Sequence, residues 1–412
     1  MTVPINQIIC GDNVETLRTL PDACVDSCVT DPPYGLEFMG KAWDKGVPGV
    51  ELWREVLRVL KPGGHLLAFA GTRTQHRMAT AIEDAGFEIR DMIAWVYGSG
   101  FPKSLDVSKA IDATDDAKRW QGWGTALKPA VERWVLARKP IAGTVAANVL
   151  AHGTGALNID GCRVACDGGS PSAARREEMN KRGTRARDGV IGSENRTSFE
   201  RETQPRPGEA LGRWPANVVL SHAETCSDEC DPVCPVAALD AQSGNRPSGF
   251  PTKGTASVTS ASYRAAAPAQ GRSLVGYGDE GGASRFFPVF HPFGYFGKAK
   301  SKSQRGGENR HPTVKNVELM RWLVRLVTPR GGLVLDAFGG SGTTGVAAIL
   351  EGCRFIAAEA DADSVETARA RLALAERGEI APPREPKPKQ PRKAAEPQPA
   401  LFAATEDDPC AA

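Results

Sequence analysis

Short apolar runs alternate with longer periodic stretches along the first part of the chain. Residues 6–10 and 25–30 are apolar runs that each end in a polar turn, and they predict β-strands. In residues 51–60 the apolar positions recur close to every 3.6 residues, which predicts a helix that stops at the following Lys-Pro-Gly-Gly. The same reading predicts a helix over 75–86 and strands over 65–70, 87–98 and 126–140. This alternation indicates a parallel sheet that is covered on both faces.

The periodicity weakens between about residue 150 and 290 and then returns. The weak stretch is rich in Gly, Ser, Arg and Pro, as in "GTRARDGVIGSENRTSFERETQPRPGEALG", and it predicts loops and a small inserted domain. The tail contains "APPREPKPKQPRKAAEPQP", which is Pro-rich and charged and predicts disorder. We therefore divide the chain into residues 1–150, 151–284, 285–378 and a tail over 379–412. In the third part we expect helices over 317–327 and 363–378, a strand, glycine turn and helix over 331–352, and a strand over 354–361.

The glycine turn, "LDAFGGSGTTG", is the first segment with chemical meaning. Asp336 ends an apolar strand, and Gly339, Gly340 and Gly342 allow the backbone to approach a ligand at the start of a helix. Glu359 ends the next strand, at the position where an acid in such folds binds a ribose hydroxyl. Taken alone, the turn fits NAD enzymes, other nucleotide binders and methyltransferases equally, and Glu359 fits a helix cap as well.

The position of this turn in the chain limits the fold. After Gly342 only about forty residues of foldable chain remain, which is too few to complete a nucleotide-binding half. The missing strands must come from the N-terminal segments 6–10 and 25–30. We therefore expect the two ends of the chain to build one sheet.

The strand over 25–30 runs into Asp31-Pro32-Pro33-Tyr34. In isolation these four residues are typical of an ordinary turn. Followed later by the glycine turn, they resemble the β class of amino DNA methyltransferases, in which the catalytic motif precedes the cofactor motif. The likeness covers roughly residues 6–150 and 285–375 and includes "HPTVKNVELM" before the glycine turn. The fold that it implies is α/β, a permuted Rossmann-like methyltransferase sheet with an inserted target-recognition region over 151–284.

The resemblance implies S-adenosylmethionine as cofactor and assigns roles to single residues. Asp31, Pro32, Pro33 and Tyr34 would be catalytic, Asp12 would face the cofactor adenine, and Glu359 would bind its ribose. Phe338, Gly340 and Thr343 would hold the methionine part, and the remaining cofactor-binding candidates are Thr313, Lys315, Asp336 and Gly342. The chain departs from the family at Asn316, where proline is commoner, and this leaves the role of Lys315 open.

The Asp-Pro-Pro-Tyr motif suits chemistry on the exocyclic amine of adenine or cytosine, a poor nucleophile whose lone pair is delocalised into the ring. If the base is flipped out of the duplex, the Asp31 carboxylate and the Pro32 carbonyl can accept the two amine hydrogens and turn the lone pair toward a methyl group. The prolines keep that carbonyl aimed, and Tyr34 can stack on the base, worth roughly 1–3 kcal/mol. No metal is required. In the family an aspartate in the first position goes more often with adenine N6 and a serine with cytosine N4.

The formal net charge of +2 does not by itself suggest a nucleic-acid partner. From Arg285 to Arg330, however, ten Lys and Arg stand against two acids, a local excess suited to duplex DNA phosphates or simply to a solvated surface. The aromatic and basic residues of "RFFPVFHPFGYFGKAKSKSQR" suit stacking and phosphate contact. The phenylalanines fit a core equally well: Phe286, Phe287, Phe290 and Phe296. The DNA-binding candidates are Lys298, Lys300, Lys302 and Arg305.

Four residues of metal-ligating types stand at four-residue steps in "SHAETCSDECDPVC": His222, Cys226, Cys230 and Cys234. On one helix they would form a stripe about 18 Å long, too extended for one zinc ion, so a site needs a break such as Asp231-Pro232. Cys162 and Cys166 are alternative ligands, and buried or free thiols are the simpler interpretation. A zinc held by four protein ligands would be structural.

The segment "MTVPINQIICGDN" does not resemble a secretion signal, and the sequence has no run of 18 apolar residues, so we expect a cytoplasmic protein with no membrane contact. Four functions are weighed: an adenine-N6 DNA methyltransferase, an N4-cytosine methyltransferase, an NAD-type oxidoreductase and a catalytically silent DNA-binding relative. The permuted motif order counts against the oxidoreductase, and Asp31 and Tyr34 count against the silent relative. A restriction endonuclease partner, a homodimer and the recognition sequence are not determined by the sequence.

Overall fold

Nine strands pair into one sheet within the residues that the structure describes, and helices lie along it. The structure, a computed structural model, describes residues 3–36, 44, 46–98, 100, 104–111, 115–165, 212–223, 226, 230–231, 234–247, 250–251, 274–275, 279–290 and 314–380. The strands of the sheet are β1 (Gln7–Cys10), β2 (Val25–Thr30), β3 (Leu60–Ala70), β4 (Glu88–Val96), β5 (Val131–Arg138), β6 (Val218–Ser221), β11 (Val289–Phe290), β12 (Leu333–Asp336) and β13 (Arg354–Glu359).

The helices follow the same order along the chain. They are α1 (Asn13–Arg18), α2 (Val50–Val59), α3 (Gln75–Asp84), α4 (Val107–Ala110), α5 (Asp115–Arg119), α6 (Val145–His152), α8 (Pro235–Ser243), α10 (Val317–Val327), α11 (Thr343–Leu350) and α12 (Ala362–Glu376), with short 3-10 turns η3 (Asp160–Cys162) and η5 (Ala283–Phe286). Two small antiparallel pairs lie outside the sheet: β7 (Arg246–Pro247) with β10 (Glu280–Gly281), and β8 (Phe250–Pro251) with β9 (Leu274–Val275).

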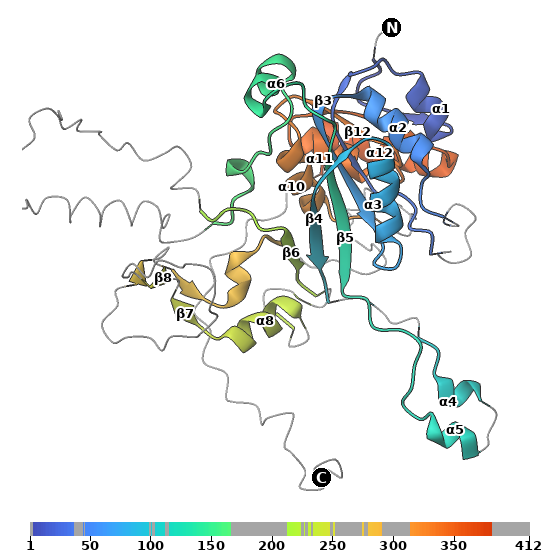
Figure 1. Ribbon diagram of the computed structural model, residues 1–412, viewed down its shortest axis with the longest axis vertical. Coiled ribbons are helices and arrows are strands. Elements are labelled where there is room, and N and C mark those ends of the chain that lie inside the picture. Colours follow the sequence, from blue (N-terminus) through green and yellow to red (C-terminus); the bar gives the residue numbers. More distant parts are fainter. Residues whose placement is uncertain are drawn as a thin grey trace, which may run out of the picture. The chain divides into compact units, whose positions relative to one another are not determined.

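The two ends of the chain build one sheet, as predicted. The strand order is β1-β13-β12-β2-β3-β5-β4-β6-β11, so the N-terminal strand β1 lies beside β13, and β2 lies beside β12. Figure 1 shows the blue N-terminal and the orange C-terminal segments in the same part of the molecule. These neighbours pair in parallel, with Cys10 opposite Glu359 and Cys28 opposite Leu335. The carboxyl ends of β1, β13, β12, β2 and β3 therefore meet at one edge of the sheet.

The expectation of an all-parallel sheet is wrong for β5. This strand runs antiparallel to both of its neighbours, with Leu67 opposite Leu136 on one side and Ile93 opposite Trp134 on the other. A parallel strand needs a crossover helix over the sheet. Between β4 and β5 the helices are instead the short α4 and α5, whose segment closes on itself through a bridge between Asp106 and Gly124. Apolar runs do not encode strand direction, so the pattern could not reveal this.

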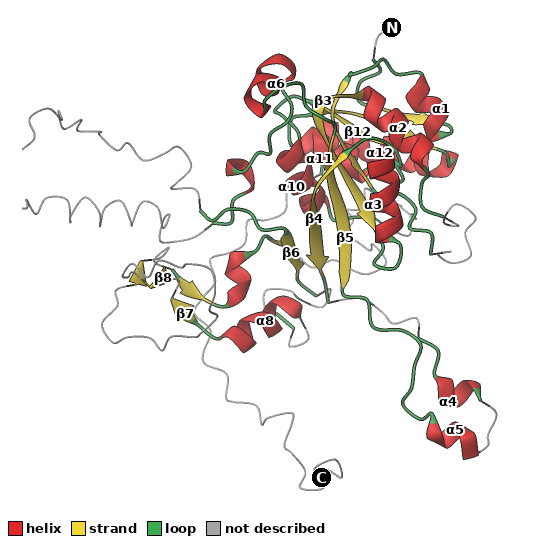
Figure 2. Cartoon of the chain, viewed as in Figure 1, coloured by secondary structure: helices red, strands yellow, loops and turns green. Residues whose placement is uncertain are grey.

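Alternate residues of the central strands enter two different cores, one on each face. In β3, Leu67 and Phe69 belong to the core that includes α10, α11 and α12, whereas Leu66 and Ala68 belong to the core that includes α1, α2 and α3. β5 divides in the same way between Trp134 and Val135. Helices thus cover both faces of the sheet (Figure 2), and strands buried on both sides explain their continuous apolar runs.

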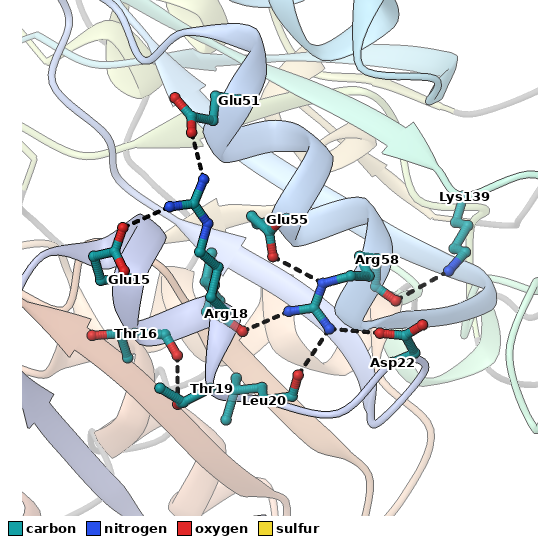
Figure 3. Close-up of polar contacts among 11 residues, drawn as sticks. Glu15, Thr16, Arg18, Thr19, Leu20, Asp22, Glu51, Glu55, Arg58 and Lys139 are labelled. Atoms are coloured by element: carbon teal, nitrogen blue, oxygen red, sulfur yellow. Dashed lines mark hydrogen bonds and ion pairs between the residues drawn. The ribbon is translucent and has the colours of Figure 1, made fainter.

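A charged cluster holds α1 and the loop after it against α2 (Figure 3). Arg58 of α2 donates to the carbonyl oxygens of Leu17 and Leu20 at 2.7 and 2.8 Å and pairs with Asp22 at 2.6 Å. Carbonyls at the end of a helix lack their regular helical partners, and Arg58 supplies donors to them, in addition to the Leu20 N–H that the Leu17 carbonyl accepts at 2.9 Å. The contacts of Arg58 fix the segment between β1 and β2, the two strands that contribute predicted site residues.

The predicted insert contributes more than loops. β6 lies within residues 151–284 yet pairs in parallel with β4, and β11 extends the same edge by pairing with β6. The folded part also continues slightly past residue 378, because Ile380 is buried in the core. All described residues fall in one compact unit, Met1–Ala381. The rest of the predicted tail, from 381 on, lies outside the described residues. Among those that are described, no helix is long and apolar enough to span a bilayer.

Candidate active site at the switch point of the sheet

The order of the strands reverses between β12 and β2. From β12 the chain passes through α11 to β13 on one side, and from β2 it passes through α2 to β3 on the other. In open α/β sheets, ligands bind beyond the carboxyl ends of the strands at such a switch point. Here those ends are followed by the glycine turn after Asp336 and by the motif that begins at Asp31.

A hydrogen bond joins the two predicted motifs directly. The Thr30 hydroxyl donates to Asp336 Oδ1 at 2.7 Å, and both side chains are buried. The same Oδ1 accepts the Phe338 N–H at 3.1 Å. Burial raises the pKa of Asp336 to about 6, although hydrogen bonds from Thr344, Thr30 and the Phe338 N–H act to lower it. Asp336 therefore anchors the start of the glycine turn beside the last residue of β2.

The glycines of the turn are required by its backbone and its packing. Gly340 and Gly342 have φ of +48° and +77°, a region that residues with a Cβ avoid. At Gly339, a Cβ would stand 2.9 Å from Ile8 Cδ1. α11 begins immediately afterwards at Thr343, so its free N–H groups and the positive end of its dipole face the turn.

The structure adds Arg371 to this turn, a residue that the sequence reading missed. Arg371 lies on α12 and is fully buried, and its guanidinium donates to the Ser341 carbonyl, to Ser341 Oγ at 2.9 Å and to Thr343 Oγ1 at 2.9 Å. Burial lowers its pKa to about 10, so the side chain remains cationic at neutral pH. An arginine within an otherwise apolar helical face was the available signal.

Glu359 also belongs to the turn. Its Oε2 accepts the Gly340 N–H at 2.7 Å and its Oε1 accepts the Asp361 N–H at 2.8 Å. A carboxylate has about four acceptor positions, so two backbone donors leave capacity for ligand hydroxyls. Asp12, at the end of β1, caps α1 by accepting the Glu15 N–H at 3.0 Å. Both acids follow strands at the same edge of the sheet.

Asp31 lies in a network of charged and hydroxyl groups. The Tyr34 hydroxyl stands 2.9 Å from Asp31 Oδ1 and 3.1 Å from Glu132 Oε2, so its single proton serves one carboxylate at a time. Lys315 Nζ lies 3.2 Å from Asp31 Oδ2, 3.2 Å from Glu132 Oε2 and 3.2 Å from the Tyr34 oxygen. Four residues from three distant parts of the chain thus share one small volume.

The charges of this network favour the ammonium form of Lys315. Burial lowers the pKa of Lys315, but the Asp31 and Glu132 carboxylates more than offset it, so the net shift is upward. Burial and the same two carboxylates raise the pKa of the Tyr34 phenol well above its ordinary value, which keeps it protonated. The ammonium also lies 4.9 Å from the centre of the Phe69 ring and 5.6 Å from that of Tyr34, within cation–π range.

Backbone contacts fix the motif from its far side. Asp44 accepts the N–H groups of Gly35 and Leu36 at 2.8 and 3.2 Å, and the Thr74 hydroxyl donates to the Tyr34 carbonyl at 2.6 Å. Asn316 caps α10 by accepting the N–H groups of Glu318 and Leu319, which places Lys315 just before that helix. This cap explains why asparagine is compatible with the fold at the departure from the family pattern.

Comparison with known proteins agrees with this geometry. Residues 25–139 and 283–370 match the model of the N6/N4 DNA methylase family. The type II methyltransferase M.HindIII of Haemophilus influenzae is 34% identical over 116 residues, which is 26% of this chain and 38% of the relative. The chain is similar to the DNA amino-methyltransferase family over these two segments. The chain thus spans well under half the length of that relative, and 36% of the type II methyltransferase M.HpaI of Haemophilus parainfluenzae, which is 29% identical over 117 residues.

Solved structures also resemble this chain. The crystal structure of the M1.HpyAVI–SAM complex has 16% identity and a TM-score of 0.39, covering 89% of this chain and 99% of the other. The PvuII DNA methyltransferase, described as cytosine-N4-specific, has 14% identity and a TM-score of 0.42, covering 92% and 94%.

The structure brings most of the predicted site residues to one edge of the sheet. Asp12, Asp31, Asp336 and Glu359 follow or end parallel strands there, and Lys315 joins Asp31. Glu132 was missed, because nothing in the sequence marks one acid of β5 as facing the motif. Some predicted residues lie outside the described ones: Thr313, Lys298, Lys300, Lys302, Arg305, Phe296 and Cys166.

Two further sequence expectations concern residues away from this edge. His222, Cys226, Cys230 and Cys234 come together, with their ligand atoms all within 4.8 Å of one another. Cys162 lies elsewhere, where its thiol donates to the Trp322 carbonyl at 3.7 Å. Of the aromatic residues before the basic segment, Phe290 packs edge-on against Trp322, and the guanidinium of Arg285 lies over the Phe286 ring, 4.4 Å from its centre. The core interpretation thus holds for Phe290.

Proposed function

We propose that this protein is a site-specific DNA methyltransferase that moves a methyl group from S-adenosylmethionine to the exocyclic amine of a flipped base. The hydrogen bond between Thr30 and Asp336 carries this proposal, because it joins the strand that leads into Asp31 to the strand that leads into the glycine turn. A methyl donor held at the turn would then lie next to an amine held at Asp31. Methyl transfer needs that adjacency, since the amine nitrogen must approach the methyl carbon closely.

The residues at the turn fit the cofactor. The N-terminus of α11 offers N–H groups to the carboxylate of the methionine part. Glu359 retains acceptor positions for the two ribose hydroxyls, and Asp12 lies at the neighbouring strand end. S-adenosylmethionine supplies an activated methyl group on a cationic sulfur.

Asp31 and the Pro32 carbonyl would orient the amine. Tyr34 and Lys315 each occupy one acceptor position of the Asp31 carboxylate, which leaves positions for an amine hydrogen. With the amine held in this way, its lone pair would face the methyl carbon of the bound cofactor, and solvent would take up the proton that the nitrogen loses. Asp31, Glu132 and Lys315 sum to one negative charge, which favours the positive charge that develops on nitrogen.

We infer adenine N6 as the acceptor, because the motif begins with Asp31. By the family resemblance, an aspartate at this position goes more often with adenine and a serine with cytosine. The partner is double-stranded DNA, read by residues 151–284 and contacted by Lys298, Lys300, Lys302 and Arg305. Replacing these four basic residues with alanine should flatten the slope of log affinity against log salt by about 0.9 per lost phosphate contact.

The test is to incubate the purified chain with labelled S-adenosylmethionine and unmethylated duplexes of varied sequence, and to identify the labelled nucleoside by mass. We expect N6-methyladenine, with activity lost in Asp31→Ala and retained in the control Asp84→Ala, an exposed aspartate at the end of α3. N4-methylcytosine would retain the mechanism and correct the base. Full activity in Asp31→Ala would refute the mechanism.

A further inference from the structure

A second cluster of reactive side chains lies at the far edge of the sheet from Asp31. His222 and Ala223 directly follow β6, Cys226 and Cys230 lie in the following loop, and Cys234 caps the start of α8. The four residues therefore do not share one helix, so they do not form the stripe of about 18 Å that would be too extended for one zinc ion. Their ligand atoms all lie within 4.8 Å of one another.

The separations suit a tetrahedral zinc site. Zinc with bonds of about 2.3 Å to sulfur and about 2.0–2.1 Å to nitrogen places neighbouring sulfur and nitrogen ligands about 3.6 Å apart. In the structure His222 Nδ1 lies 3.3 Å from Cys230 Sγ and 3.5 Å from Cys234 Sγ. A Cys₃His set is a common ligand set of structural zinc sites.

Backbone N–H groups point at two of the sulfur atoms. The Ala223 N–H lies 3.4 Å from Cys234 Sγ, and the Asp231 N–H lies 3.3 Å from Cys226 Sγ. Such donors stabilise the negative charge of thiolate ligands and fix their orientation. The dipole of the nine-residue helix α8 acts in the same direction, because Cys234 is at its N-terminus. Both the N–H donors and the helix dipole therefore favour thiolate ligands at this site.

The surroundings give the metal a structural task. The apolar core here is small, with six buried members: Leu220, Ala223, Cys226, Cys234, Val236 and Ala237. A core of this size contributes little stability, and small modules commonly rely on a metal or disulfide. Asp240 of α8 in turn accepts the N–H and hydroxyl of Ser284 at 2.8 Å, which ties α8 to η5.

We propose that His222, Cys226, Cys230 and Cys234 hold one structural zinc ion that fastens α8 to the end of β6. Four protein ligands complete a tetrahedral shell, so no position is left for a substrate and the ion takes no part in methyl transfer. Because β6 pairs with β4, the ion would anchor the inserted region to the sheet that carries the active site. This proposal stands independently of the proposed methyl transfer.

The first measurement is the metal content of the full chain, purified without chelators and without added metal. We expect about one zinc per chain, with three sulfur and one nitrogen ligand in the zinc X-ray absorption spectrum. Cobalt exchanged into the site should show the visible bands of a tetrahedral thiolate complex. A chain without zinc that also fails to bind cobalt would overturn the proposal, as would a native disulfide between two of Cys226, Cys230 and Cys234.

Variants separate ligation from general effects on folding. Cys234→Ser should weaken zinc binding by more than the 10–100-fold that follows loss of an outer-shell partner. Cys162→Ser is the matched control, a buried cysteine of the same part of the chain outside the cluster, and should retain the zinc. His222→Cys should also retain zinc but shift the cobalt spectrum toward that of four thiolates. Zinc loss from the control, or an unchanged spectrum in His222→Cys, would contradict the assignment.

Discussion

Replacing Lys315 with methionine tests the electrostatic arrangement around Asp31. The ammonium lies 3.2 Å from carboxylate oxygens of both Asp31 and Glu132, and its side chain is 10% exposed. Methionine has a similar shape and packs against the same rings, so the main loss is the charge. The variant leaves two carboxylates facing each other with only the Tyr34 hydroxyl between them.

The magnitude follows from the burial of the pair. Removing one partner of a buried ion pair costs about 3–5 kcal/mol. The side chains of Asp31 and Glu132 remain 24% and 18% exposed. Water can therefore reach them partly, and we expect a loss near the lower end, about 3 kcal/mol of unfolding free energy. Glu132→Gln alone keeps the Lys315–Asp31 pair and should cost about 1 kcal/mol, the value of one hydrogen bond.

The double variant Lys315→Met/Glu132→Gln removes the repulsion as well as the ammonium. It should therefore be less destabilised than the two single variants summed, by about 1.5–2 kcal/mol, within the range measured for residues of one network. Urea unfolding of the four proteins gives this coupling from midpoints and slopes.

Lys139→Met is the matched control for this cycle. Lys139 donates to the carbonyl oxygens of Leu60 and Arg58 rather than to a carboxylate. Its combination with Glu132→Gln should be additive within about 0.5 kcal/mol. Additivity in the Lys315 cycle would show that the two carboxylates do not repel each other through this site, and would refute the reasoning.

Four other substitutions have outcomes that the structure determines. Burial lowers the pKa of His65 from 6.5 to about 4. The neutral side chain therefore contributes its full stabilisation above pH 6.5, and this contribution is lost as the pH falls toward 4. In His65→Gln the unfolding free energy should fall by about 3 kcal/mol less over that pH range. Burial raises the pKa of Asp336 from 3.8 to about 6, so its charge costs stability above pH 6. Asp336→Asn should therefore raise the unfolding free energy by up to about 3 kcal/mol at pH 7.5 but not below pH 3.8. Equal stability of the two proteins at pH 7.5 would contradict the burial argument. Gly342→Ala should lower the unfolding free energy by more than the strain of about 1–2 kcal/mol at a positive φ, because its Cβ would lie 2.9 Å from Ala368 Cβ. Gly352→Ala, with open space around it, should cost only the strain. Equal losses of stability in thermal or urea unfolding would count against the packing argument.

The sequence marked the residues of the candidate site more completely than it predicted the sheet. Asp31 and Asp336 were recognisable because each ends an apolar strand and begins a motif, and the length of chain after Gly342 required the two ends to meet. The direction of β5 could not be predicted, since its residues are buried on both faces whichever way the strand runs. β6 was hidden because four residues with no period are indistinguishable from a loop.

Local sequence determines where strands and helices begin and end, and which residue types stand at the ends of strands, because backbone preferences and apolar periodicity act over a few neighbours. Local sequence therefore identified the Asp31 motif, the glycine turn, Glu359 and the four candidate metal ligands. Only the tertiary structure joined Thr30 to Asp336, brought Lys315 and Glu132 to Asp31, and gathered His222 with Cys234. These contacts depend on the packing of distant segments, and no local pattern records which side chains such packing brings together.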